Sequence, residues 1–330
     1  MYYEHFGLQT NPFQMTPDPA FLYLTPQYRE AIASLTYAIL AQKGFVVLTG
    51  EAGTGKTTLI RRVIQCIPED VLRSSIILNP TLSAPEFLET AMLDFGLRNL
   101  PSSKALRLLK FNDFLIAGRT QRKITTLIID EAHTLDRSVL EEIRLLSNFE
   151  SATEKLLQIV LLGQPELDSI LNREDLRQLK QRIALRMKIQ PLAMSEVEQY
   201  MRSRWHKAGA TVELPFDSEA IKEVAGASTG IPRLINSLSD NALLLAFAEG
   251  VSKVTRKHVS DAGQELQIAR TAVNDIPAAK AETTTVSPLH DDMPPSPIPR
   301  FRTLDRDIRR SWFWWRSEKP AAPVGQKSVI

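Results

Sequence analysis

One short motif limits the folds that are open to this chain of 330 residues. The stretch from Gly50 to Thr57 reads G-E-A-G-T-G-K-T and fits the pattern G-x-x-x-x-G-K-[ST]. It follows an apolar run at 45–48 and precedes a helix-like run at 58–64, so its context is a strand, a loop and a helix. A glycine-rich turn that only imitates the motif would not need this context. We therefore predict a phosphate-binding loop for ATP or GTP.

Each part of this loop has a chemical role in the prediction. Glycines let successive main-chain N–H groups point toward phosphate oxygens, and the start of the following helix adds the positive end of its dipole. Lys56 is expected to reach the β and γ phosphates, and the Thr57 hydroxyl to coordinate Mg²⁺. The residues predicted to bind the nucleotide are Gly50, Glu51, Ala52, Gly53, Thr54, Gly55, Lys56, Thr57 and Thr58.

A second apolar run, at 126–129, ends in two acids, Asp130 and Glu131. Its β-branched residues are typical of a buried parallel strand. Two adjacent acids can also cap the start of a helix, but behind a phosphate-binding loop we favour a catalytic pair. Asp130 is predicted to hold Mg²⁺, and Glu131 to orient and polarise the water that attacks the γ-phosphate.

Two further strand-like runs end in polar residues. The run at 156–163 is followed by Gln164, at the end of a strand where an open α/β sheet meets its ligand, so we predict that Gln164 senses the γ-phosphate. The run at 75–78 is followed by Asn79, which could bond to Glu131 and hold it away from water. Asn79 also precedes a proline and is an ordinary turn former, and we favour the turn.

Helix-like stretches, in which leucines recur three or four residues apart, alternate with these strands. They lie at 84–97, 103–119 and 138–149. Strands that alternate with helices predict an α/β fold, with a parallel sheet covered by helices on both faces. Further helical patterns lie at 195–208, 218–228, 232–249 and 255–267.

The composition is that of a globular protein in a reducing compartment. The single cysteine, Cys66, cannot form an intramolecular disulfide, and its amphipathic surroundings at 64–67 predict a small buried residue. Neither a signal-peptide pattern nor an apolar run of membrane-spanning length is evident, so we expect a cytoplasmic protein. The net charge of +2 does not by itself indicate a nucleic-acid partner.

The last part of the chain has a different composition. Residues 271–299 are rich in Pro, Ala, Thr and Ser, which predicts a disordered linker. Residues 300–330 form a tail that combines arginines with a tryptophan cluster at 312–315. Such a tail could lie on an anionic membrane surface or grip a partner. It could equally be a loose tail with exposed aromatic residues, and both interpretations stay open.

With these residues placed, the chain resembles the AAA+ ATPases, and within them the family of general secretion pathway protein A, also called ExeA. The resemblance runs from Tyr2 to about Ala262 and implies that the nucleotide is ATP. Besides the nucleotide motifs it rests on Y-E-H-F-G-L at 3–8, N-P-F at 11–13, T-P-D-P at 16–19, R-E-A at 29–31, L-L-S-N-F-E at 145–150, L-G-Q-P-E-L at 162–167 and G-I-P-R-L-I-N at 230–236.

This resemblance implies roles for three arginines. Arg182, in the Q-R-I-A-L-R stretch at 181–186, matches the arginine finger that acts on the γ-phosphate of a neighbouring subunit, and Arg186 is the second choice. A basic, solvated helix face is the alternative for both. Arg233, in G-I-P-R, resembles the sensor-2 arginine that the lid domain carries to the same nucleotide.

The implied domain plan has five parts. An N-terminal family-specific segment at 1–40 leads into the AAA+ nucleotide-binding domain at 41–192, and the helical lid at 193–270, the linker and the tail follow. Two features depart from the family. His133 stands where the family more often has Gln, and the transmembrane helix and peptidoglycan-binding module of full-length members are not seen in this sequence.

The expected function is ATP hydrolysis by a homo-oligomer that helps to assemble a secretion or pilus-type complex, peripheral to the inner membrane and in contact with its assembly proteins. The alternative is an ATP-dependent, DNA-binding regulator of transposition. It is supported by basic residues at 61–62, 119–123 and 173–188. No DNA-reading motif is evident. A slow nucleotide switch is a third interpretation, and the intact Glu131 argues against it.

Overall fold

The structure is a computed structural model that describes residues 2–78, 81–151 and 154–268. These residues belong to one compact unit, 1–274. The predictions for Asn79, for the linker at 271–299 and for the tail at 300–330 fall outside the described residues.

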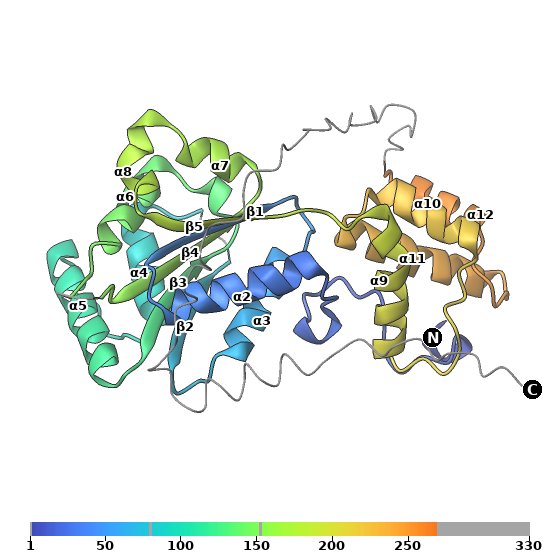
Figure 1. The fold of residues 1–330 in the computed structure, drawn as a ribbon, viewed down its shortest axis with the longest axis horizontal. Helices are drawn as coiled ribbons and strands as arrows, with labels where there is room; N and C mark the ends of the chain where they lie inside the picture. Colours follow the sequence, from blue (N-terminus) through green and yellow to red (C-terminus); the bar gives the residue numbers. More distant parts are fainter. Residues whose placement is uncertain (1, 79–80, 152–153, 269–330) are drawn as a thin grey trace, which may run out of the picture. The chain divides into compact units, whose positions relative to one another are not determined.

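A parallel sheet forms the core of the region that carries the phosphate-binding loop (Figure 1). Its strand order is β2-β3-β4-β1-β5, so β4 lies between the strand before the phosphate-binding loop and the strand before the acidic pair. The predicted α/β fold class is thereby confirmed. The bounds of the strands are β1 Phe45–Gly50, β2 Leu72–Ile77, β3 Ile124–Ile129, β4 Leu157–Gly163 and β5 Ile183–Ile189.

Helices cover both faces of this sheet because alternate side chains of each strand point to opposite faces. On β1, Val46 and Leu48 pack with α2 (Pro26–Leu40) and α3 (Lys56–Cys66). Phe45 and Val47 belong to the core on the other face. That core is closed by α4 (Ala84–Asp94), α5 (Lys104–Thr120), α6 (Arg137–Leu146), α7 (Glu166–Leu171) and α8 (Arg177–Lys180).

Strand β5 corrects one interpretation of the sequence. The basic stretch that contains Arg186 is not a solvated helix face, because residues 183–189 pair with β1 as an edge strand. Leu185, Met187 and Ile189 pack into one core, while the residues between them are exposed. This alternation with a period of two residues is the signal for a half-buried strand, and it was present in the sequence.

Cys66 also differs from its prediction. It was expected to be a small buried residue, but it is exposed at the end of α3. The next residue, Ile67, is 3% exposed and fills the core at this point. The larger apolar side chain therefore takes the buried position where the helix ends.

The predicted lid helices are present at positions close to those expected. They are α9 (Met194–Lys207), α10 (Ser218–Ser228), α11 (Pro232–Ala248) and α12 (Arg256–Glu265), and they share a separate hydrophobic core. The N-terminal segment divides between the two regions. The short helix α1 (Tyr2–His5) and the side chains of Phe6, Phe13 and Phe21 join the lid core, whereas α2 packs on the sheet. The exact domain boundaries stay predictions.

Membrane-spanning helices are not found among the described residues: none of their helices has the length and apolar content that a bilayer requires.

A buried arginine ties the N-terminal segment to the lid. Arg204 of α9 is 7% exposed, and its guanidinium donates to the carbonyl oxygens of Pro12 at 2.6 Å and Gln14 at 3.4 Å. The same group lies over the ring of Phe21, 4.8 Å from its centroid. Asn236 of α11 adds a hydrogen bond to the Gln14 carbonyl. The segment that contains residues 12–21 is thus anchored through its main chain.

We expect Arg204→Ala to lower the free energy of unfolding by about 3 kcal/mol, because it removes charged hydrogen bonds and leaves buried carbonyl oxygens without donors. Arg202→Ala on the same helix is the matched control. Arg202 pairs with Glu198 at an exposed site, and its loss should cost less than about 0.5 kcal/mol. Urea denaturation of both variants measures the difference, and equal midpoints would contradict the anchoring role.

Candidate nucleotide-binding site

The phosphate-binding loop connects the end of β1 to the start of α3. Gly53 and Gly55 have φ values of +79° and +90°, which favour glycine because a Cβ atom would be strained there. Gly55 is the N-cap residue directly before α3, so the first N–H groups of the helix open toward the loop. The sequence thus builds the loop geometry that was predicted for binding phosphate.

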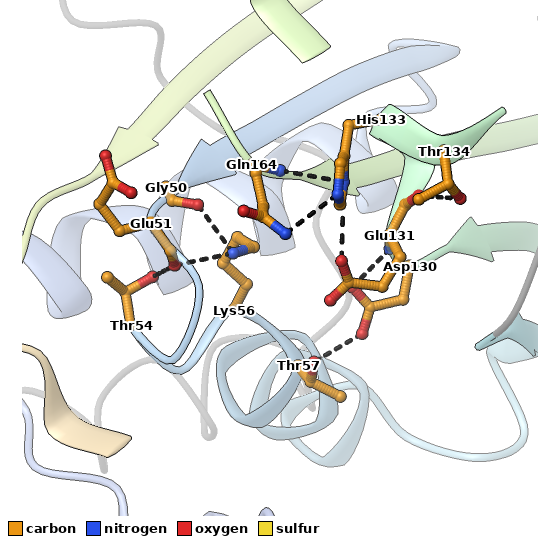
Figure 2. Close-up of polar contacts among 10 residues, drawn as sticks. All are labelled: Gly50, Glu51, Thr54, Lys56, Thr57, Asp130, Glu131, His133, Thr134 and Gln164. Carbon is orange, nitrogen blue, oxygen red and sulfur yellow. Dashed lines mark hydrogen bonds and ion pairs between the residues drawn. The ribbon is translucent and has the colours of Figure 1, made fainter. Parts of the chain in front are cut away.

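The ammonium group of Lys56 is fixed inside this loop. Its Nζ donates to the carbonyl oxygens of Gly50 at 2.8 Å and Glu51 at 3.0 Å (Figure 2). Burial lowers the pKa of the Lys56 side chain below its usual value, and the nearby carboxylates of Glu131 and Asp130 oppose this effect. The loop therefore holds a desolvated cation, which attracts an anionic ligand more strongly than an exposed lysine does.

The predicted metal ligands lie together. The Thr57 hydroxyl donates to Asp130 Oδ2 at 2.5 Å, and Asp130 is 4% exposed at the end of β3. Within residues 2–78, 81–151 and 154–268 there is no cluster of three or more His, Cys, Asp or Glu side chains that could hold a metal alone. A hydroxyl and one carboxylate fit Mg²⁺, which binds to few protein oxygens and completes its shell with water and phosphate.

Glu131 has an uncommon main-chain conformation. Its φ of +52° and ψ of +34° are left-handed, and the turn η2 (Ala132–Thr134) follows it. The Glu131 carbonyl accepts hydrogen bonds from the N–H of Thr134 at 2.9 Å and from its hydroxyl at 2.8 Å. Non-glycine residues in this region cost free energy, and such strain is concentrated at functional sites. The turn directs the carboxylate of Glu131 to the side on which Lys56 lies (Figure 2).

Gln164 is linked to Glu131 by His133, a residue to which the sequence analysis gave no role in the site. The Gln164 side-chain amide contacts His133 Nε2 at 3.0 Å, and His133 Nδ1 lies 3.6 Å from Glu131 Oε2. Figure 2 shows these side chains and Lys56 grouped around the carboxyl ends of the strands. The predicted Gln164 position thus belongs to the same cluster as Glu131.

An open cleft lies next to the loop, with a volume of about 1030 Å³ that includes its mouth. The loop residues Gly53 to Thr58 line the cleft together with Glu131 from the sheet and Arg233 from the lid. The N-terminal segment contributes its further walls, among them Thr16, Pro17, Asp18 and Tyr23.

Arg233 meets the loop directly. Its main-chain N–H donates to the Gly53 carbonyl at 3.2 Å, and a Cβ atom built on Gly53 would lie 2.6 Å from Arg233 Cβ. The structure therefore brings the predicted sensor-2 residue to the cleft from the N-terminal turn of α11.

The two finger candidates do not line the cleft. Arg182 donates to the Ser147 carbonyl at 3.4 Å. Arg186 donates to Asp168 at 3.4 Å, and Asp168 accepts from the Thr49 hydroxyl at 2.9 Å, next to the loop. A position outside the cleft is required of a residue that acts on a neighbouring subunit. Their roles stay predictions.

Tyr28 is a site residue that the sequence analysis did not single out. It is buried on α2, burial raises the pKa of its phenol, and its hydroxyl donates to the main-chain oxygen of Thr54 in the loop. The cleft-lining residues Tyr200 and Asn236, joined by a 2.8 Å hydrogen bond, were also missed. Only the motif T-P-D-P at 16–19 signalled the N-terminal wall, and nothing in its spacing linked it to the loop.

Comparisons with known proteins fit this geometry. Residues 39–171 match the family model described as AAA domain. General secretion pathway protein A of Aeromonas hydrophila is 41% identical over 270 residues, which are 81% of this chain and 48% of that protein. The chain belongs to the AAA proteins similar to general secretion pathway protein A. It spans about half the length of this relative.

Solved structures show the same AAA fold. The ORC1 protein of Aeropyrum pernix, in complex with DNA, has a TM-score of 0.61 and 17% identity, and covers 78% of this chain and 69% of its own. Cdc6p from Pyrobaculum aerophilum has a TM-score of 0.60 and 16% identity, with coverage of 76% and 71%. At these identities the likeness shows the fold, which is that of nucleotide-binding P-loop proteins.

We expect Gly53→Ala to weaken nucleotide binding more than tenfold, since its new methyl group would collide with Arg233 and separate α11 from the loop. Gly96→Ala is the control, because Gly96 has a φ of +89° and nothing within 4 Å of an added Cβ. Both variants carry backbone strain of about 1–2 kcal/mol. Titration with a fluorescent ATP analogue measures the nucleotide affinity of both variants. Equal affinities would contradict a role for the contact between Gly53 and Arg233 in nucleotide binding.

Proposed function

We propose that this AAA protein hydrolyses ATP at the site formed by the loop, the acidic pair and the lid arginine. The observation that carries the proposal is the cluster of Lys56, Thr57, Asp130 and Glu131 beyond the carboxyl ends of β1 and β3. A binding module without hydrolysis would not need an acid in a strained conformation beside the cation.

The residues divide the chemistry among them. Lys56 and the main-chain N–H groups of the loop bind the phosphates and offset their charge. Thr57 and Asp130 would hold Mg²⁺, which supplies further charge neutralisation. Glu131 orients a water and takes up its proton. Gln164, the predicted γ-phosphate sensor, lies behind Glu131 and does not line the cleft.

Arg233 gives the lid a direct connection to the nucleotide. Its main chain is bonded to Gly53, and its side chain belongs to the cleft wall. A change of charge on the bound phosphates therefore changes the electrostatic attraction between the phosphates and Arg233 of α11. We infer that hydrolysis alters the contact between lid and loop, which is the conformational signal passed to partners.

At the level of the cell, we infer that a homo-oligomer uses this cycle to assemble a secretion or pilus-type envelope complex at the inner membrane. The support is the identity of 41% to general secretion pathway protein A over 81% of this chain. In such an oligomer Arg182, or Arg186 after release from Asp168, would reach the nucleotide of the neighbouring subunit.

The first test is ATP hydrolysis by the purified protein with Mg²⁺. Lys56→Ala should abolish both nucleotide binding and hydrolysis, whereas Glu131→Gln should keep binding and lower kcat by about 10²–10⁴-fold. Binding is measured as a rise in melting temperature, since a ligand at a hundred times its Kd stabilises the folded state by about 2.7 kcal/mol. Hydrolysis that survives in Glu131→Gln would remove Glu131 from the mechanism.

The same assay with double-stranded DNA distinguishes the alternative function. We expect hydrolysis that depends on Lys56 and does not respond to DNA. Stimulation by DNA that fades as salt is raised would instead support a DNA-binding regulator, because phosphate contacts release counterions and weaken steeply with salt.

A further inference from the structure

His133 occupies a position that none of the roles above explains. It lies in the turn η2, directly after the strained Glu131, and its side chain is 15% exposed. It is not among the residues that line the cleft. Its main-chain nitrogen would lie 3.4 Å from a Cβ built on Gly163 at the end of β4, which shows how closely the turn packs against that strand.

Both ring nitrogens of His133 have neighbours in the cluster (Figure 2). Nε2 contacts the side-chain amide of Gln164 at 3.0 Å, and Nδ1 lies 3.4 Å from the main-chain nitrogen of Gln164. Nδ1 also faces Glu131 Oε2 at 3.6 Å. Among the residues that the structure describes, His133 is the one basic side chain found at ion-pair distance from the Glu131 carboxylate, and the two form an ion pair only when the imidazole is protonated.

These contacts connect Gln164, after β4, to Glu131, after the neighbouring strand β3, with the His133 ring between them. With its proton on Nδ1, the neutral ring presents a donor to Glu131 and accepts from the Gln164 side-chain amide at Nε2, so the contact at Nε2 holds the ring in place. The Glu131 side chain is 47% exposed and has several rotatable bonds, so its carboxylate needs a fixed neighbour to keep one direction.

We propose that His133 is a positioning residue that fixes the orientation of the Glu131 carboxylate and couples it to Gln164. The proposal rests on the hydrolytic function argued above, in which Glu131 activates water. A distance of 3.6 Å is longer than a hydrogen bond, and such contacts between catalytic groups tighten when the reacting complex forms. A movement of Gln164 thereby changes the orientation of the Glu131 carboxylate, which acts on the water.

Two substitutions of His133 distinguish the effect of its ring nitrogens from the effect of its size. His133→Phe keeps a ring of similar size and removes both nitrogens. His133→Asn keeps a polar atom near the place of Nδ1, next to Glu131 and to the Gln164 N–H, and removes only Nε2. If the contact with Glu131 is what matters, Asn restores a part of the activity that Phe loses. The exposed His206 of α9, changed to Phe, serves as the matched control.

We expect His133→Phe to lower kcat on the order of tenfold, which is part of the 10²–10⁴-fold that a general base contributes. KM and the nucleotide-induced rise in melting temperature should stay at the wild-type values, since His133 does not line the cleft. His133→Asn should recover a kcat within about threefold of wild type. His206→Phe should match wild type in all these measurements.

The coupling is measured with a double-mutant cycle of His133→Phe and Gln164→Ala. If the two residues act through one contact chain, the double variant is no slower than the slower single variant. Independent effects, in which the losses multiply, would overturn the proposal. A kcat of His133→Phe equal to wild type, or an equal loss in Phe and Asn variants, would overturn it as well.

These outcomes remain distinct from failure of the proposed function. Wild-type protein that binds ATP without Lys56-dependent hydrolysis would refute the hydrolytic function, and this inference with it. Wild-type hydrolysis that His133→Phe leaves unchanged would refute only the role of His133. A purely structural role would instead lower the melting temperature and nucleotide affinity together with kcat.

Discussion

The adjacency of three parallel strand ends is the constraint on which the site depends. Strand β4 pairs with β1 on one side and with β3 on the other, and all three run in the same direction. Their carboxyl ends therefore meet at one edge of the sheet, where Lys56, Gln164 and the Asp130–Glu131 pair follow the strands. The apolar runs buried on both faces hold this register, because a slip of one residue would move every side chain to the opposite face.

A second constraint joins the lid to this edge through the N-terminal segment. Arg204 binds main-chain oxygens of the segment, and the residues that follow form a wall of the cleft. Tyr28 and Arg233 then contact main-chain atoms of the loop from two sides. Main-chain hydrogen bonds of this kind do not depend on the side chains of the residues that accept them. The loop is consequently held by elements that are far from it in the sequence.

Sequence reasoning succeeded where local pattern and chemistry agree. The apolar runs before Gly50 and Asp130 are strands, and the lid helices lie close to their expected bounds because their apolar residues recur with helical spacing. The prediction for Cys66 was wrong, because the helix end leaves its side chain exposed, and β5 excludes the alternative of a helix face for Arg186. The alternation that indicates β5 was present in the sequence, whereas the exposure of Cys66 depends on which element packs nearby.

The sequence by itself determined the loop, the acidic pair and the AAA resemblance, because glycines, a lysine and adjacent acids at strand ends have fixed chemical uses. Only the tertiary structure decided that Gln164 reaches Glu131 by way of His133, that Arg233 contacts Gly53, and that both finger candidates lie outside the cleft. The physical reason is that these relations join residues from different strands and helices. Such contacts are set by strand order and by packing, and residue type alone does not encode them.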